Sequence, residues 1–181
     1  ASLEKVDGVD VVAAASFTGA QMTLPDDSKP GGFIGGIDPE TYGQVFKVKM
    51  ETGELSDIEA GTMAVDRQIA EKHKIELGDE ISVVSASGRT GTYKVSAISD
   101  EPNLLGQFTL VKADADKLNA SPTDAFLGIK LAPGRSVESM RPALEKVTDQ
   151  YPTMRLQDSE QFTGSIVKQI KAVLNVIYGL L

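Results

Sequence analysis

The sequence predicts an α+β fold: a mixed α/β lobe that contains a βαβ unit, a β-rich lobe that contains a hairpin, and a C-terminal stalk helix. Segment 81–98 alternates apolar and polar residues on both sides of a glycine-containing turn, which is typical of a β-hairpin. Segment 125–156 has the order strand, helix, strand that makes a βαβ unit. Segment 162–181 repeats apolar residues at helical spacing.

The N-terminal part predicts two strands, separated by a loop, and then a helix. Val9–Phe17 is rich in β-branched and small residues, which favour a buried strand. The Pro- and Gly-rich segment 25–32 predicts a loop, and Phe33–Ile37 predicts the next strand. Asp38 is a favoured N-cap and Pro39 a favoured first helical residue, because proline lacks only an N–H that has no partner there. A short helix is therefore expected from Pro39.

The segment from Gly61 to Ile98 has the most regular pattern of predicted strands and helices. Gly61–Val65 predicts a strand, and Asp66 can cap a helix that extends to Lys74. A turn then leads to the two strands of the hairpin, Ile81–Ala86 and Thr92–Ile98. The residues expected on the buried face of the second strand are Tyr93, Val95 and Ala97.

The last third predicts alternating strands and helices. Phe108–Leu118 has the pattern of a strand followed by a helix, and Ala125–Leu131 predicts another strand. A helix to about Gln150 and a return strand at Thr153–Leu156 complete the βαβ unit, which implies parallel strands and a right-handed crossover. The apolar face expected for this helix consists of Val137, Met140, Leu144, Val147 and Tyr151.

The start of this helix depends on the position of Pro142. Ser139 is a better N-cap than Ser136, because it places Pro142 in the first turn, where a missing N–H costs little.

The C-terminal segment becomes steadily more apolar. Lys168 and Lys171 are followed by Ala172–Leu181, which carries no charged side chain. A membrane span needs about 20 apolar residues, so this run predicts the start of a truncated transmembrane helix. The opening Ser2–Val6 is similarly interpreted as the end of a preceding helix. The alternative is that Phe162–Leu181 is an amphipathic helix packed on its own domain.

Composition excludes several classes of function. The chain has 181 residues and a formal net charge of −8. Binding to nucleic acid needs a clustered basic surface, so no nucleic-acid partner is expected. The same charge argues against adhesion of the domain body to anionic lipid. Cysteine is absent, which excludes disulfides, thiol catalysis and thiolate metal sites.

No catalytic, cofactor-binding or metal-binding residues are expected. His73 is the only histidine and is interpreted as a cationic side chain near a helix C-terminus. Segment 32–36 is rich in glycine but matches no phosphate-binding motif, and Ser165–Lys168 matches SxxK without its companion motifs. Among the clustered carboxylates, Asp38 and Asp114 are expected to cap helices at strand-to-helix turns.

An ordered set of short motifs resembles the extracytoplasmic core domain of MacB-like/FtsX-like ABC-transporter permeases. No single motif is specific, but together they cover nearly the whole chain in order. The matching segments are Phe33–Pro39, Gly53–Leu55, Thr62–Asp66, Ala70, Ile75–Val83, Ala125–Leu156 and Asp158–Phe162.

The resemblance implies a domain inserted between the first two transmembrane helices of a permease, on the extracellular or periplasmic face of the cell membrane. It implies a porter-like α/β lobe at 1–29 and 117–161, and a sabre-like β-rich lobe at 30–116. Segment 162–181 would be the stalk helix and the start of the membrane span. Gly78 and Asp79 match the family motif as a structural turn, and the resemblance implies no substrate-binding residues.

The implied function is to couple cytoplasmic ATP hydrolysis to export or mechanotransmission, without catalysis in this domain. The implied partners are a cytoplasmic ATPase subunit, a second permease copy, and an exported or extracted peptide, lipid or lipoprotein. The alternative is a soluble peptide- or lipid-binding module whose terminal amphipathic helix covers its own groove. An enzyme is disfavoured by the missing cysteine and the single histidine.

If the resemblance is correct, the reading frame should continue past Leu181 with more than about ten further apolar residues, enough to complete a span. Two more spans should follow, and one should precede Ala1. Sequencing the full reading frame checks this expectation, and a stop codon directly after Leu181 would contradict it.

Overall fold

The computed structural model describes residues 3–158 and residue 161, and the predicted stalk at 162–181 lies outside the described residues. The chain forms two compact units, one of Asp10–Lys130 and one of Ala1–Val9 with Leu131–Leu181. These bounds differ from those of the two lobes implied by the resemblance, which stay a prediction. Within the described part of the chain, no helix has the length and apolar character needed to cross a bilayer.

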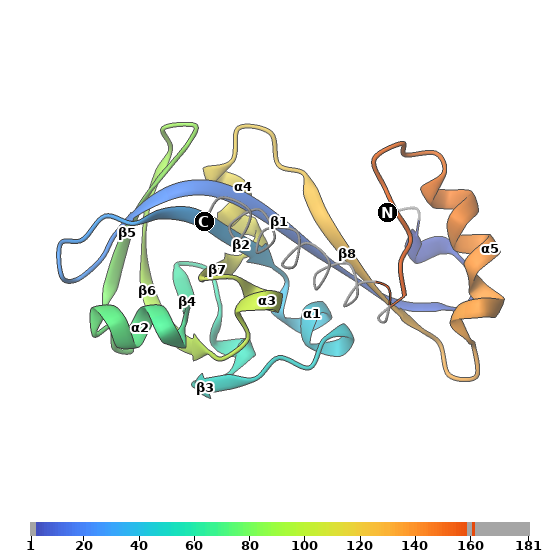
Figure 1. Cartoon of the computed structure of the whole chain (residues 1–181), viewed down its shortest axis with the longest axis horizontal. Coiled ribbons are helices and arrows are strands. Elements are labelled where there is room, and N and C mark those ends of the chain that lie inside the picture. The colour runs from blue at the N-terminus through green and yellow to red at the C-terminus, as the bar shows by residue number, and fades with distance from the viewer. Residues whose placement is uncertain (1–2, 159–160, 162–181) are drawn as a thin grey trace, which may run out of the picture. The chain divides into compact units, whose positions relative to one another are not determined.

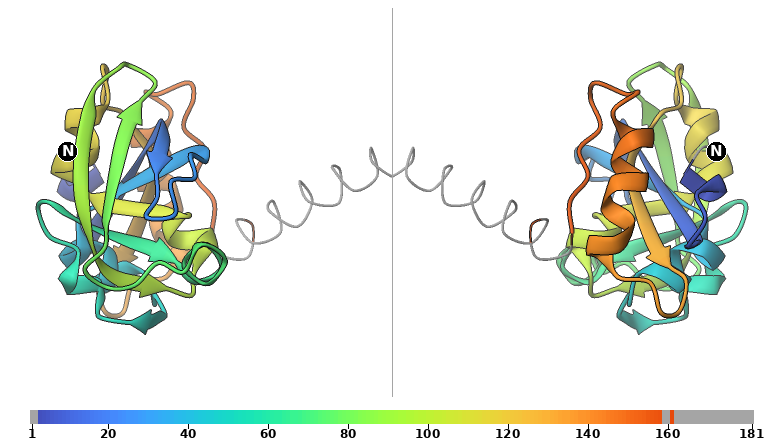
Figure 2. Two further views of the ribbon diagram at one scale, coloured as in Figure 1. Left: turned by 90° about the vertical axis from the view of Figure 1, so that its left-hand side faces the viewer. Right: turned by 90° about the vertical axis from the view of Figure 1, so that its right-hand side faces the viewer.

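Six strands of the larger unit close into a barrel (Figures 1 and 2). They pair in the order β1–β2–β7–β4–β6–β5, and β5 pairs with β1 again. The barrel strands are β1 (Val9–Thr23), β2 (Gly31–Ile37), β4 (Thr62–Asp66), β5 (Glu80–Ser85), β6 (Thr90–Ser99) and β7 (Phe108–Val111). Two further strands lie outside the ring: β3 (Met50–Thr52) pairs with β6, and β8 (Asp124–Leu131) pairs with β1.

The interior of the barrel is the main hydrophobic core. Paired residues in neighbouring strands share a face, so the register identifies the inward positions. Ile34 of β2 pairs with Phe108 of β7, and Phe108 pairs with Val65 of β4. All three are at most 1% exposed. Their neighbours from the other strands in this buried cluster include Met22, Ile81, Val83, Tyr93 and Val95.

Short helices cover the two ends of the barrel. The helix α2 (Arg67–His73) follows β4, and α4 (Lys112–Leu118) follows β7. Because β4 and β7 are antiparallel, their carboxyl ends lie at opposite ends of the barrel, and each helix closes one of them. Ala70 of α2 and Ala115 of α4 belong to the barrel core. At Gly36 a Cβ atom would lie 2.5 Å from the Ala115 Cβ, so this close approach requires glycine.

A second core lies on part of the outer face of the barrel. It is formed by α1 (Pro39–Val45), the 3-10 turn η2 (Leu55–Asp57) and α3 (Pro102–Leu105), packed over small barrel residues such as Ala64 and Ala97. The Tyr42 hydroxyl donates to the Leu104 carbonyl oxygen at 2.6 Å. Burial raises the pKa of Tyr42 to about 12, so the phenol stays neutral at physiological pH.

Most local predictions for the larger unit are confirmed. The Asp38 carboxylate accepts from the Thr41 N–H at 3.1 Å, and the Asp66 carboxylate caps α2 through the Gln68 N–H at 3.1 Å. The hairpin is β5 and β6, and Tyr93 and Val95 face the barrel interior as expected. Ala97 is also buried, but in the second core on the outer face, because the pairing of β4 with β6 shifts register between Met63 and Ala64. The first strand, in contrast, is longer than predicted, because the glycine and polar residues after Phe17 still pair with β2 and β5.

The smaller unit differs from the prediction in two respects. Ser136, and not Ser139, is the N-cap of α5 (Val137–Thr148), because the two serines form a reciprocal capping box. Ser136 Oγ accepts from the Ser139 N–H at 3.2 Å, and Ser139 Oγ accepts from the Ser136 N–H at 3.2 Å. Pro142 therefore lies inside the helix, on its exposed side.

The return strand at Thr153–Leu156 is absent, so the predicted βαβ unit is wrong. After α5 the chain makes turns, with the Met154 N–H bonded to the Tyr151 carbonyl oxygen at 2.9 Å. Asp158 then forms an ion pair with Arg141 of α5 at 3.2 Å. The segment is thus held along the helix by polar contacts, and its side chains are largely exposed.

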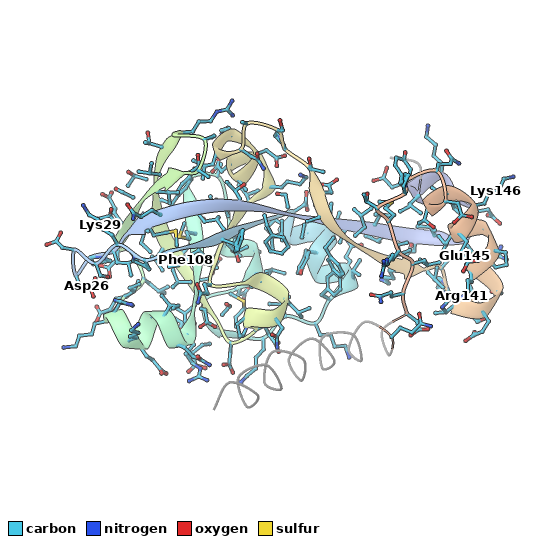
Figure 3. All side chains as sticks on the ribbon, turned by 45° about the horizontal axis from the view of Figure 1, so that its top comes forward. Asp26, Lys29, Phe108, Arg141, Glu145 and Lys146 are labelled. Carbon is cyan, nitrogen blue, oxygen red and sulfur yellow. The ribbon has the colours of Figure 1, made fainter. Side chains whose placement is uncertain are left out.

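Phe108 and Phe33 together test the assignment of the core, because one ring is buried and the other is exposed. Phe108 lies inside the barrel and is 1% exposed, whereas Phe33 is 69% exposed (Figure 3 labels Phe108). We expect Phe108→Ala to lower the free energy of unfolding by about 3–5 kcal/mol. Phe33→Ala should change it by less than about 0.5 kcal/mol. Chemical denaturation of both variants measures this, and equal losses would contradict the assignment of the core.

Candidate functional site

Gly78 and Asp79 lie in the turn that joins α2 to β5. Gly78 has φ +96°, a conformation that favours glycine. Its N–H donates to the Val95 carbonyl oxygen at 2.8 Å, and the Asp79 carboxylate accepts from the Glu76 N–H at 2.8 Å. The Val95 N–H returns a bond to the Asp79 carbonyl oxygen at 2.8 Å. These bonds fasten the turn to β6 and account for the residue type at both positions.

The β1–β2 loop meets the end of α2 at a cluster of Asp26, Ser28 and His73, which we call the loop junction. Nδ1 of His73 lies 2.8 Å from Oδ2 of Asp26 and 3.1 Å from Oγ of Ser28. The Ser28 hydroxyl and its backbone N–H both donate to Oδ1 of Asp26. The hydrogen bonds from Ser28, followed by the contact with His73, lower the pKa of Asp26 to about 2.

The loop junction contains the residue types of a serine hydrolase triad but not its geometry. In a triad the carboxylate and the serine occupy opposite nitrogens of the imidazole, so that a proton can pass from one side to the other. Here both groups contact the same nitrogen, and the serine donates to the carboxylate. The loop junction therefore has no activated nucleophile. His73 lies in the last turn of α2, as predicted, but its partner Asp26 was not predicted from the sequence.

Asp114 is a buried carboxylate that joins α4 to the start of β4. It lies in the first turn of α4 and is not the N-cap, so the predicted capping role is wrong; the N-cap is Val111. Its carboxylate accepts from the Gly61 N–H at 2.7 Å and from Lys117 Nζ at 2.7 Å. Burial alone would raise the pKa of Asp114, but these two hydrogen bonds and the Lys117 charge outweigh it and hold the pKa below its usual value.

The same end of the barrel has a second polar contact, between the β5–β6 turn and the C-terminus of α4. Arg89 donates to the carbonyl oxygens of Lys117 at 3.0 Å and Asn119 at 2.7 Å. Ser87 Oγ donates to the Leu118 carbonyl oxygen at 2.9 Å. These donors satisfy carbonyl groups that have no partner inside the helix, and they fix α4 over the barrel.

An exposed apolar surface lies on the outer face of the barrel, on β1, β2 and β5. It consists of Phe17, Phe33 and Val84, which are 43%, 69% and 46% exposed. Phe17 pairs with Gly35, and Phe33 pairs with Gly19, so each ring stands beside a residue without a side chain. This surface was not predicted, because Val9–Phe17 was interpreted only as a buried strand from its β-branched and small residues.

Among residues 3–158 and 161, no group of three or more histidine, aspartate or glutamate side chains is arranged to hold a metal ion. The described part of the chain thus offers structural polar contacts and the exposed apolar surface of Phe17, Phe33 and Val84.

Comparison with solved structures identifies the fold. One match is a domain of a putative permease from Porphyromonas gingivalis, with 19% identity, a TM-score of 0.59, and coverage of 84% of this chain and 75% of that chain. Another is the extracellular domain of the noncanonic ABC-type transporter YknZ from Gram-positive bacteria, with 18% identity, a TM-score of 0.61, and coverage of 84% and 82%. A third is the periplasmic region of MacB from Actinobacillus actinomycetemcomitans, with 12% identity, a TM-score of 0.65, and coverage of 91% and 79%.

The chain has the fold of extracytoplasmic ABC-permease domains. No protein-family model and no curated protein matches the sequence. The structure thus confirms the fold implied by the motif resemblance. The 12–19% identity to these domains shows a shared fold and not a shared function.

The Asp114 contacts should make stability depend on pH. A carboxylate whose pKa is lowered by folding contributes stability above its unfolded pKa, and this contribution is lost as pH falls through the lowered value. We expect Asp114→Asn to lower the free energy of unfolding by about 1–3 kcal/mol at pH 7. The difference from wild type should shrink below about pH 4.

Urea unfolding between pH 7 and pH 3 measures this difference. Glu76→Gln, which removes an exposed carboxylate, is the control and should follow wild type at every pH. A difference between Asp114→Asn and wild type that stays constant across the pH range would contradict the electrostatic origin of the effect.

Proposed function

We propose that this chain is the extracytoplasmic domain of an ABC-type permease, where it couples cytoplasmic ATP hydrolysis to export or mechanotransmission. The observation that carries the proposal is the fold. Three permease domains share it over 84–91% of this chain. Because one fold can serve several functions, the proposal also needs support from the described residues.

The first support is that the described residues suit a mechanical or binding role better than a chemical one. The one cluster of serine, histidine and aspartate, the loop junction, lacks the geometry of a nucleophilic site. The helices at both ends of the barrel are held by polar side-chain contacts, among them Asp26 to His73 at one end and Arg89 to Asn119 at the other. A barrel fixed in this way can move as one body.

The second support is the course of the chain. It passes from one unit to the other twice, at Val9–Asp10 and at Lys130–Leu131. Both crossings fall at ends of strands, β1 and β8, which are hydrogen-bonded neighbours in the sheet. The chain thus connects the two units covalently at two places, and we propose that force is passed to the barrel along both connections.

The proposal places the domain outside the cell membrane, with segment 162–181 leading into the bilayer. Its partners would be a cytoplasmic ATPase subunit, a second permease copy, and an exported or extracted peptide, lipid or lipoprotein. The lobe division at 1–29 with 117–161, and 30–116, belongs to the same proposal, as does a structural role for Gly78 and Asp79.

A second candidate function is a soluble peptide- or lipid-binding module. The exposed surface of Phe17, Phe33 and Val84 favours it, because large apolar side chains gathered on one face commonly mark interaction sites. The two candidates differ in location, since only the permease domain must be fixed to a membrane and face outward.

Cysteine labelling tests the location of the domain. The chain contains no cysteine, so Lys29→Cys adds a single reactive group at an exposed position of the β1–β2 loop (Figure 3). We expect a membrane-impermeant maleimide to label this variant in the full-length protein, with other cysteines replaced, on cells with an intact inner membrane. Labelling only after lysis, or recovery of the protein in the soluble fraction, would exclude the permease domain.

Met63→Cys is the matched control, because Met63 is fully buried; it should react only after denaturation. The coupling of ATP hydrolysis to transport is tested separately, with a variant of the ATPase subunit that binds ATP but does not hydrolyse it. This variant should abolish transport by the full-length permease. Lys29→Cys should still be labelled from outside.

A further inference from the structure

Two consecutive residues of α5 contact the N-terminal and the C-terminal segments of the smaller unit. Met140 is 4% exposed and lies against Gly8, where a Cβ atom would be 2.8 Å from the Met140 Sδ atom. Arg141, the next residue, donates from Nη2 to Oδ2 of Asp158 at 3.2 Å (Figure 3 labels Arg141). The helix α5 therefore holds one residue near the start of the described chain and one near its end.

Asp158 uses its two carboxylate oxygens for different partners. Oδ2 accepts from Arg141, whereas Oδ1 accepts from the Gln161 N–H at 2.8 Å. The Gln161 side chain returns the bond, because its Oε1 accepts from the Asp158 N–H at 3.2 Å. This reciprocal pair is a capping box, the arrangement that begins helices, and residue 161 is helical. Asp158 is thus placed as the N-cap of the stalk helix that the sequence predicts at 162–181.

The ion pair determines how the Asp158 carboxylate is presented to the capping box. The side chains of Arg141 and Asp158 are 30% and 28% exposed, so water screens the pair only in part. A cap requires one orientation of the carboxylate, and holding a side chain in one rotamer costs conformational entropy. Because Arg141 binds Oδ2, Oδ1 stays directed at the Gln161 N–H. Arg141 also lies 3.6 Å from Oε1 of Glu145, one turn further along α5, which orients the guanidinium.

We propose that Arg141 is a positioning residue, which fixes the start of the C-terminal helix on α5 through the Asp158 carboxylate. The start of that helix then has a defined place relative to α5, instead of following a flexible joint after the largely exposed segment 151–157. A mechanical role for this contact rests on the proposed function, because only a stalk that leads into the membrane would carry force to α5. The contact itself and its test do not require that function.

Hydrogen exchange of the Gln161 amide measures how often the capping box opens, since this N–H bonds to Asp158. Using the full chain at pH 7 and low salt, we expect Arg141→Gln to lower the protection factor of this amide about two- to fivefold, the range for a partly exposed ion pair. Glutamine has a helix propensity close to that of arginine, so α5 itself should be preserved. The Met140 amide, which bonds to the Ser136 carbonyl oxygen in the first turn of α5, is the reference.

Further variants separate the ion pair from other effects. Asp158→Asn keeps an acceptor for the cap, because asparagine is an equally good N-cap, but it removes the charge. It should lose as much protection as Arg141→Gln, and the double variant should lose no more. Arg141→Lys keeps the positive charge and should retain most of the protection. Arg155→Gln, the matched control, removes an exposed guanidinium from the segment before Asp158 and should change nothing.

A positioning role for Arg141 is excluded if the Gln161 amide is unprotected in wild type, or if Arg141→Gln leaves its protection unchanged. It is also excluded if Arg155→Gln lowers the protection equally, or if the two single losses add in the double variant. In 1 M salt the difference between wild type and Arg141→Gln should shrink, because the Debye length falls to about 3 Å. A difference that salt leaves unchanged would contradict the ion pair. These measurements involve no membrane and no ATPase, so failure of the proposed function would not alter them.

Discussion

Closure of the barrel through β1 is the constraint on which the rest of the structure depends. β1 has 15 residues and pairs with β2 over Ala15–Gln21 and with β5 over Ala20–Thr23. Without the pairing to β2, the sheet would be open, with β2 as an unpaired edge. With it, the inward side chains of all six strands meet in one core. The residues of that core come from segments as far apart as Met22 and Leu118.

Closure also determines where polar contacts are needed. A closed barrel removes the edges of the sheet but leaves two open ends, and the interior is apolar. Because β4 and β7 are antiparallel, the helices that follow them cover opposite ends. Each helix is then fastened by a carboxylate or a guanidinium from a neighbouring segment: His73 by Asp26 at one end, and the α4 terminus by Arg89 at the other. The polar network is thus a consequence of the topology.

How well the sequence predicted this fold depends on how far apart in the chain the interacting residues are. Asp38 and Asp66 act on N–H groups two or three residues away, so residue type and order were sufficient to predict both caps. Capping of α5 was mispredicted because the rule for Pro142 was weighed more heavily than the reciprocal bonds of Ser136 and Ser139. The pairing of β1 with two other strands leaves no local pattern, and neither does the contact of Asp26 with a histidine 47 positions later.

The candidate sites were harder to predict than the fold, because the physical constraints on the barrel interior do not extend to its outer surface. A barrel interior accepts any set of apolar residues of suitable volume, so domains with only 12–19% identity to this chain can share its fold. The outer surface is not constrained in this way. Phe17 and Phe33 are costly to leave in water and contribute nothing to the barrel core, whose members lie on the opposite face of the same strands. Features of this kind can differ between such domains without disturbing the barrel, so we expect any difference in recognition to lie there and not in the shared fold.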